Sequence, residues 1–132
     1  MPTSGRARIG VRISQDVWLE EVERLHPRSP ARVAAERERR RLESEGLEIR
    51  ELRACSAEAE DGTSLGGLFK VYVPIREASS SQRPFAFVFS PAGRGADVYL
   101  RLMAFGERHP LRGTRSVYER AHKRLHGRYP DR

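Results

Sequence analysis

Hydrophobic and polar residues alternate in four segments of the chain, and this period of two predicts four β-strands. In the first segment, residues 8–13, Ile9, Val11 and Ile13 alternate with arginine and glycine, which predicts a half-buried strand with a basic outer face. The other three segments are residues 68–75, 84–90 and 97–105. Short connections join these three, so we expect an antiparallel meander.

A helical period predicts three helices. Ser14 is a candidate N-cap, and Trp18, Val22 and Leu25 follow at helical spacing, so the first helix is expected to end before the Pro27 region. The second helix, residues 30–45, starts with a Ser-Pro pair and stops at a glycine. The third spans about residues 115–126.

The second predicted helix has an unusually charged sequence. Residues 36–43 are almost all Glu and Arg, and the apolar stripe (Ala31, Ala35, Leu42) is thin. Two interpretations stay open: the arginines form a solvated helix face, or they form a ridge that faces RNA or the ribosome.

The order strand, helix, helix, three strands, helix predicts an α+β fold, a small antiparallel sheet with helices packed on one face. A chain of 132 residues has room for one domain, so we expect residues 1–132 to form a single domain, with residues 1–7 as a flexible N-terminus. Residues 56–67 are acidic and then rich in Gly and Ser, and they are expected to form a loop.

The charge balance adds a candidate partner. Lys and Arg number 25 against 18 Asp and Glu, the net charge is +7, and the only lysines are Lys70 and Lys123. Guanidinium groups grip phosphate oxygens in pairs, so an arginine-rich surface suits nucleic acid. The alternative explanation of the many arginines is a GC-rich genome, with a surface that is merely soluble.

The sequence also indicates where the protein is located. Cys55 is the only cysteine, so no internal disulfide can form. The sequence has no signal-peptide pattern and no apolar run of membrane length, so we expect a soluble, cytoplasmic protein without a membrane role.

The histidines give little support for a metal. His122 and His126 lie four residues apart on a predicted helix, a spacing that two metal ligands can use. No carboxylate or cysteine lies at ligand spacing, and Lys123 and Arg124 separate the two histidines. A basic helix face that contributes Lys123 and Arg124 to substrate binding is the better interpretation, and we expect no metal and no cofactor.

Basic and aromatic side chains are predicted to converge near the ends of the meander strands and on the last helix. RNA cleavage without a metal needs a base for the 2′-hydroxyl, an acid for the 5′-leaving oxygen, and cations for the charge on phosphorus, and these residue types can supply all three. The candidates are Lys70, Tyr72, Arg83, Arg101, Arg108, His109, Tyr118 and His122.

The same segments resemble the RelE/ParE family of toxins from toxin–antitoxin systems. Residues 105–108 read Phe-Gly-Glu-Arg, and residues 116–125 read Ser-Val-Tyr-Glu-Arg-Ala-His-Lys-Arg-Leu. They look like the family's last strand, which ends in Gly-x-Arg, followed by a helix of the form Val-Tyr-x-x-Ala-x-Lys-Arg-Leu. Residues 68–73, Leu-Phe-Lys-Val-Tyr-Val, look like the strand that lines the catalytic groove. The order of elements after residue 8 also matches.

The resemblance implies roles for three residues. Lys70 matches the lysine of the groove strand, Arg108 the arginine that clamps the phosphate, and Tyr118 the tyrosine that stacks on or polarises the substrate. The chain departs from the pattern where Tyr72 replaces a second groove lysine and where Arg83 is offset from the middle-strand arginine. These departures leave room for His109 or His122 as the general base. Each of the three matched residues also has a plain structural interpretation, in packing or solvation.

We therefore expect a toxin that is a metal-independent endoribonuclease acting on mRNA, in complex with the ribosome or free. The resemblance implies a cognate antitoxin that covers the groove, in a toxin–antitoxin hetero-oligomer. Two alternatives stay open: a ParE-like inhibitor of DNA gyrase without nuclease activity, and an inactive basic module that binds nucleic acid on the same scaffold.

Overall fold

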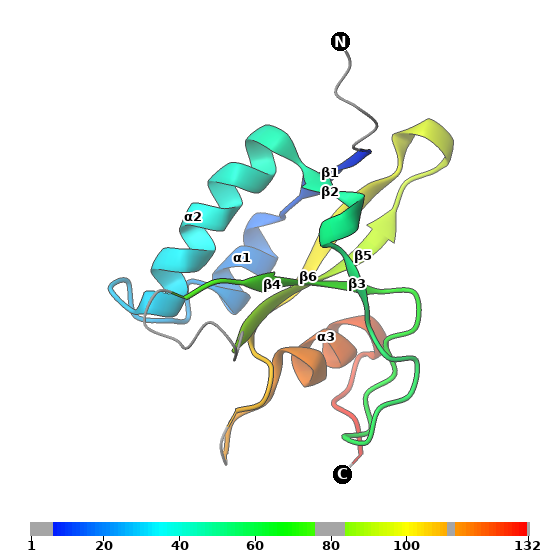
Figure 1. Cartoon of the computed structure of the whole chain (residues 1–132). Coiled ribbons are helices and arrows are strands. Elements are labelled where there is room, and N and C mark those ends of the chain that lie inside the picture. The colour runs from blue at the N-terminus through cyan, green and yellow to red at the C-terminus, as the bar shows by residue number, and fades with distance from the viewer. Residues whose placement is uncertain (1–6, 76–83, 111–112, 132) are drawn as a thin grey trace.

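A computed structural model describes residues 7–75, 84–110 and 113–131 of the chain (Figure 1). Arg83, one of the candidate site residues, lies outside the described residues. The elements are β1 (Arg8–Arg12), α1 (Gln15–Glu21), α2 (Pro30–Glu45), β2 (Leu47–Glu48), η1 (Ile49–Glu51), β3 (Arg53–Ala54), β4 (Phe69–Val73), β5 (Phe85–Ala92), η2 (Gly95–Asp97), β6 (Tyr99–Glu107) and α3 (Val117–His126).

In the described part of the chain the strands form one sheet in the order β2-β1-β6-β5-β4-β3. The predicted α+β class and the antiparallel meander of β4, β5 and β6 are confirmed. The prediction of an antiparallel sheet is wrong, because β1 pairs in parallel with β6, with Arg12 opposite Arg101. The connection from β1 to its neighbour passes through most of the chain, and local alternation carries no information about that direction.

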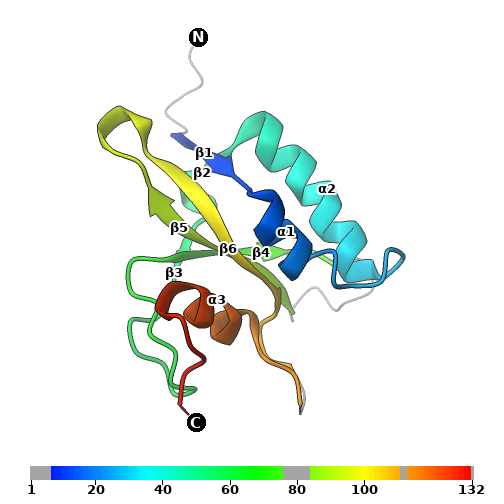
Figure 2. The same cartoon turned by 180° about the vertical axis from the view of Figure 1, so that it is seen from behind.

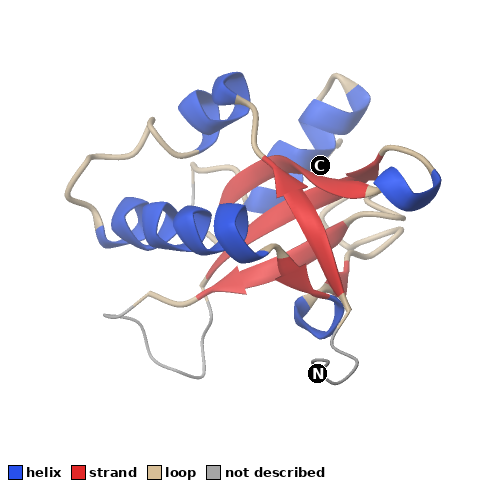
Figure 3. Ribbon diagram, turned by 90° about the horizontal axis from the view of Figure 1, so that it is seen from above, coloured by secondary structure: helices blue, strands red, loops and turns tan. Residues whose placement is uncertain are grey.

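The sheet is curled, and its two edges are joined by a short segment. β2 pairs with β1 at one edge and β3 pairs with β4 at the other, although only η1 and one further residue separate β2 from β3. Figure 3 shows the strands wrapping around in this way. Both edge strands have two residues, too few for alternation to be read from the sequence.

Helices cover both faces of the sheet, so the expectation that they pack on one face is wrong (Figure 2). One core packs α1 and α2 against the sheet through Trp18, Leu42 and the phenylalanines of β5. A second, smaller core packs α3 against the other face through Val117 and Ala121.

An irregularity in the β5–β6 pairing shifts the alternation of β6 between the two cores. Val88 lies opposite Ala104 but Phe89 lies opposite Leu102, so Met103 has no partner in the ladder. Leu102 consequently packs with α1 and α2, whereas the consecutive residues Met103 and Ala104 pack with α3.

The second half of β6 has an open edge, because β1 is too short to reach it. Charged side chains take the place of a strand there. Glu21 accepts a hydrogen bond from the Phe105 N–H at 3.1 Å, Arg124 donates to the Met103 carbonyl at 2.7 Å, and Arg24 donates to the Phe105 carbonyl at 3.1 Å. Arg124 thereby bridges α3 and the sheet, and these three backbone groups of the edge have hydrogen-bond partners.

The helix starts predicted from Ser14 and from the Ser-Pro pair are confirmed, since Ser14 and Ser29 cap α1 and α2 through their side chains. The first helix ends earlier than predicted, at Glu21. On α2, Arg39 stacks on Trp18 at 4.5 Å and Arg41 pairs with Glu38 and Glu51, so part of the arginine run serves packing. In the described residues, no helix has both the length and the apolar character needed to cross a bilayer.

Candidate functional site

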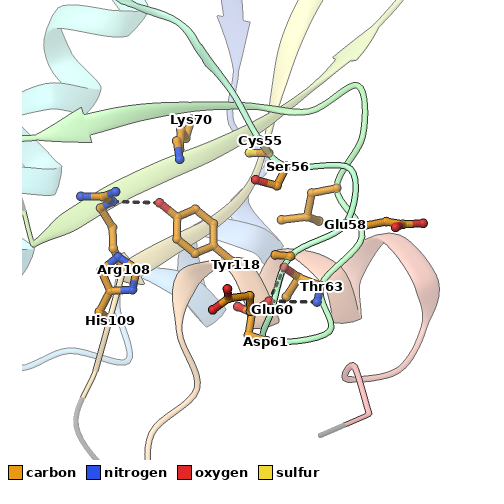
Figure 4. Close-up of a pocket in the computed structure, with 12 residues that line it drawn as sticks. Cys55, Ser56, Glu58, Glu60, Asp61, Thr63, Lys70, Arg108, His109 and Tyr118 are labelled. Atoms are coloured by element: carbon orange, nitrogen blue, oxygen red, sulfur yellow. Dashed lines mark hydrogen bonds between the residues drawn. The ribbon is translucent and has the colours of Figure 1, made fainter.

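A cavity of about 470 Å³ opens where β4, the end of β6, α3 and the loop after β3 meet (Figure 4). β4 contributes Lys70, the residues after β6 contribute Arg108 and His109, and α3 contributes Tyr118. The loop supplies the rest of the wall: Cys55, Ser56, Glu58, Ala59, Glu60, Asp61, Thr63 and Leu65. Four of the ten candidate residues thus lie around one space.

Arg108 is held from three directions. Its backbone N–H donates to the Pro84 carbonyl at 2.7 Å, which extends the pairing with β5 beyond the strand. Its guanidinium lies 4.5 Å from the centre of the Tyr72 ring, and its Nε donates to the Tyr118 hydroxyl at 2.8 Å. The stack on Tyr72 orients the guanidinium. Tyr72, where the family pattern has a lysine, therefore supports the arginine in this chain.

Lys70 lies on one side of the Tyr118 ring and α3 lies on the other (Figure 4). It lies on the same face of β4 as Tyr72, because the two are separated by one residue. Its Nζ is 5.2 Å from the centre of the Tyr118 ring and 6.0 Å from that of Tyr72. In Figure 4, Lys70, Arg108 and the Tyr118 hydroxyl point into the same space.

The first turn of α3 presents Tyr118. Ser116 caps this helix: its hydroxyl accepts from the Glu119 N–H at 3.1 Å, and the Glu119 carboxylate accepts from the Ser116 N–H at 3.0 Å. Val117 and Ala121 are fully buried against the sheet, so the half-buried Tyr118 projects beside the end of β6. The cap and the apolar pair together determine where the tyrosine hydroxyl lies.

His109 completes the basic side of the cavity. It is exposed, and its ring centre lies 6.4 Å from that of Tyr118. An imidazole in this place can donate a hydrogen bond to, or accept one from, a ligand in the cavity.

The opposite wall is acidic, and sequence reasoning missed its part in the site. Glu58, Glu60 and Asp61 all line the cavity. Asp61 is tied into its turn, because its Oδ1 accepts from the Thr63 N–H at 2.9 Å and from the Thr63 hydroxyl at 2.7 Å. The acidic run at residues 58–61 was the available signal, but nothing local shows which surface a loop covers. The cavity therefore offers carboxylates on one side and cations on the other.

Cys55 is part of the lining but is buried. Burial raises the pKa of the Cys55 thiol to about 11, so the thiol is protonated at neutral pH and is a poor nucleophile.

His122 lies behind the acidic loop and is absent from the cavity lining. Its Nδ1 accepts a hydrogen bond from the Ser64 N–H at 3.1 Å, and His126 Nε2 lies 2.9 Å from the Ser64 carbonyl oxygen. Burial, followed by the nearby His126 and Arg128, lowers the pKa of His122, which favours the neutral imidazole that can accept this bond. The structure thus gives His122 and His126 a role in holding the loop.

Three other candidates lie away from the cavity. Arg101 is exposed near the start of β6, opposite Arg12. Lys123 lies 4.7 Å from the centre of the Tyr129 ring. Arg124 is occupied by Glu21, Glu20 and the Met103 carbonyl.

Within the described ranges, no three His, Cys, Asp or Glu side chains gather closely enough to hold a metal ion. No family model, curated protein or solved structure matches this chain.

Proposed function

We propose that the chain is a toxin of the RelE/ParE kind that cleaves mRNA without a metal ion, free or on the ribosome. The observation that carries the proposal is the convergence of Lys70, Arg108, His109 and Tyr118 around one cavity, from β4, the end of β6 and α3. The order strand, two helices, three-strand meander and helix supports the resemblance, with β2 and β3 as additions.

The chemistry requires attack of a ribose 2′-oxygen on phosphorus and departure of the 5′-oxygen. The Lys70 ammonium and the Arg108 guanidinium lie on the Tyr118 side of the cavity, where their positive charges can stabilise the charge on the phosphate oxygens. Because Arg108 Nε donates to the Tyr118 oxygen, the tyrosine keeps its own O–H to donate. Tyr118 is then the proton donor for the leaving oxygen, and His109 or a carboxylate of the acidic loop takes the 2′-proton.

The acidic wall favours one alternative, a scaffold that binds a partner in this cavity without cleaving RNA. Carboxylates from residues 58–61 face the space that a phosphate would occupy, and their charge opposes its entry. A gyrase inhibitor is the other alternative, and it would cause DNA breaks, whereas the nuclease cleaves mRNA.

The cleavage test compares the unmodified protein with Arg108→Ala and Tyr118→Phe on free mRNA and on programmed ribosomes. Loss of the Arg108 guanidinium should reduce the cleavage rate about a hundredfold. Tyr118→Phe keeps the ring and removes the hydroxyl, so a strong loss identifies proton transfer and a mild loss identifies stacking. Arg94→Ala, an exposed arginine of the β5–β6 hairpin, is the control for charge, and Tyr129→Phe is the control for a tyrosine hydroxyl elsewhere.

Transcripts that remain intact in cells expressing the unmodified chain would refute the nuclease. If DNA breaks appear in the same cells, the gyrase alternative takes its place. Harmless expression with neither kind of damage would leave the binding scaffold.

The proposal includes a small acidic antitoxin encoded beside this chain. The net charge of +7 and exposed arginines such as Arg37 and Arg40 on α2 offer a cationic surface that a disordered acidic segment can wrap. Co-expression with each flanking gene product, followed by pull-down at moderate salt, should recover one tight complex. Recovery of none would remove the antitoxin from the proposal.

A further inference from the structure

The sheet face that carries α3 is only partly covered. α3 packs on the second half of β6, through Met103 and Ala104, while the β5–β6 hairpin extends beyond the helix (Figure 2). Arg12, Tyr99 and Arg101 share this face: Arg12 lies opposite Arg101, and alternate residues of β6 point the same way. Both arginines are exposed, and Tyr99 is half-buried.

These two arginines have no compensating charge among the described residues. Neither makes a hydrogen bond or an ion pair there, whereas Arg8 on the same strand pairs with Glu48 at 3.1 Å. Like charges directly opposite one another on neighbouring strands destabilise a sheet. An anion between them removes that cost.

Tyr99 orients one of the two guanidinium groups. The Arg12 Cζ atom lies 4.0 Å from the centre of the Tyr99 ring, a cation–π contact, and Arg12 remains exposed. Gly10 is the partner of Tyr99 on β1, and a Cβ built there meets no atom within 4 Å. The strand therefore leaves an open space beside the ring.

We propose that Arg12, Tyr99 and Arg101 form a second surface, the arginine platform, which binds the backbone of single-stranded RNA without reading its sequence. Paired guanidiniums suit phosphate, and an aromatic ring among cations suits unpaired bases, whose flat faces a duplex hides in its stack. The platform lies at the other end of β6 from Arg108, so it holds a strand at a distance from the cavity. This inference rests on the proposed function, in which the arginine platform holds the RNA substrate, but the binding of RNA by the platform does not depend on cleavage.

The test measures the affinity for a short labelled 2′-O-methyl oligoribonucleotide, which lacks the free 2′-hydroxyl needed for cleavage. The double variant Arg12→Gln, Arg101→Gln should bind on the order of tenfold more weakly, and its plot of log affinity against log salt should be less steep by about 1.4, since each single-strand phosphate contact contributes about 0.7. The matched control is Arg28→Gln, Arg128→Gln, which removes the same charge from two exposed positions outside the platform and should leave the affinity within about twofold.

A second pair of variants uses the open space at Gly10. Gly10→Glu places a carboxylate beside Arg12 and should weaken binding as much as the double variant, whereas Gly10→Gln should have little effect. Equal losses of affinity in the platform double variant and the control double variant, or no loss in either, would overturn the proposal. Binding of duplex DNA as tightly as the single strand, through the same residues, would also overturn it, in favour of a general polyanion surface. Because the probe cannot be cleaved, a failure here leaves the cleavage test unaffected, and loss of cleavage in Arg108→Ala leaves this test unaffected.

Discussion

Replacement of Glu21 by Gln should destabilise the fold far more than the same change at its neighbour Glu20. The Glu21 side chain is 2% exposed, and its carboxylate pairs with Arg120 at 2.7 Å and Arg124 at 3.0 Å while also accepting from the Phe105 N–H. Gln keeps the size of the side chain but loses the charge and turns an amide N–H₂ toward two cations.

The expected loss follows from the exposure of the partners. Breaking a buried ion pair from one side costs about 3–5 kcal/mol. Arg120 and Arg124 are each 21% exposed and can recover some hydration, so we take the lower end, about 3 kcal/mol, or roughly 10 °C in melting temperature. The Glu20 side chain is 67% exposed, and Glu20→Gln should cost no more than about 0.5 kcal/mol, although it too pairs with Arg124.

Urea unfolding at pH 7, followed by circular dichroism, measures the free energy of unfolding of both variants.

The pH dependence of the stability gives a second check. Burial alone raises the pKa of Glu21, but the hydrogen bonds and charges of Arg120 and Arg124 outweigh it and hold the pKa below the ordinary value. The stabilisation is therefore complete above about pH 4.3 and is lost as the pH falls through the lowered pKa. Similar losses in Glu20→Gln and Glu21→Gln would refute this account of the buried network.

Two further predictions concern the elements that form the cavity. The pKa of His122 is lowered in the folded chain, so as the pH drops below about 6.5 the unfolded chain takes up this proton before the folded chain does, and stability should fall. His122→Asn keeps an acceptor for the Ser64 N–H, so the urea midpoint of this variant should change less between pH 7.5 and 5.5 than that of the unmodified chain. An equal change of the midpoint in both proteins would contradict the assignment. Ser116→Ala should cost about 1 kcal/mol in urea unfolding by removing the cap of α3, and a loss of under about 0.3 kcal/mol would show that the cap contributes little.

The elements that local chemistry specifies could be predicted from the sequence. Ser29 and Pro30 determine where α2 begins, and the alternation in residues 68–75, 84–90 and 97–105 found the three meander strands. The parallel pairing of β1 could not be found this way, because alternation is the same in parallel and antiparallel strands. Nor could the division of the helices between two faces be found, because helical spacing does not show which face of the sheet a helix covers.

The same limit applies to the candidate site. Helical spacing correctly places Tyr118 and His122 on neighbouring turns of α3, yet the acidic loop comes between them, so one lines the cavity and the other binds the loop. Arg101 alternates with the core residues of β6 as predicted, but the strand is long enough to carry it far from Arg108. Residue type and period identify candidates, and only the long-range path of the chain decides which of them meet.

The charged side chains along the open edge of β6 also limit how the molecule can associate. An exposed strand edge is a template on which another chain can add a strand. Here Glu21, Arg24 and Arg124 already occupy the backbone groups of Met103 and Phe105, so an incoming strand would have to displace buried ion pairs before it gained a hydrogen bond. Fibre growth by edge-to-edge stacking is thereby disfavoured at this part of β6.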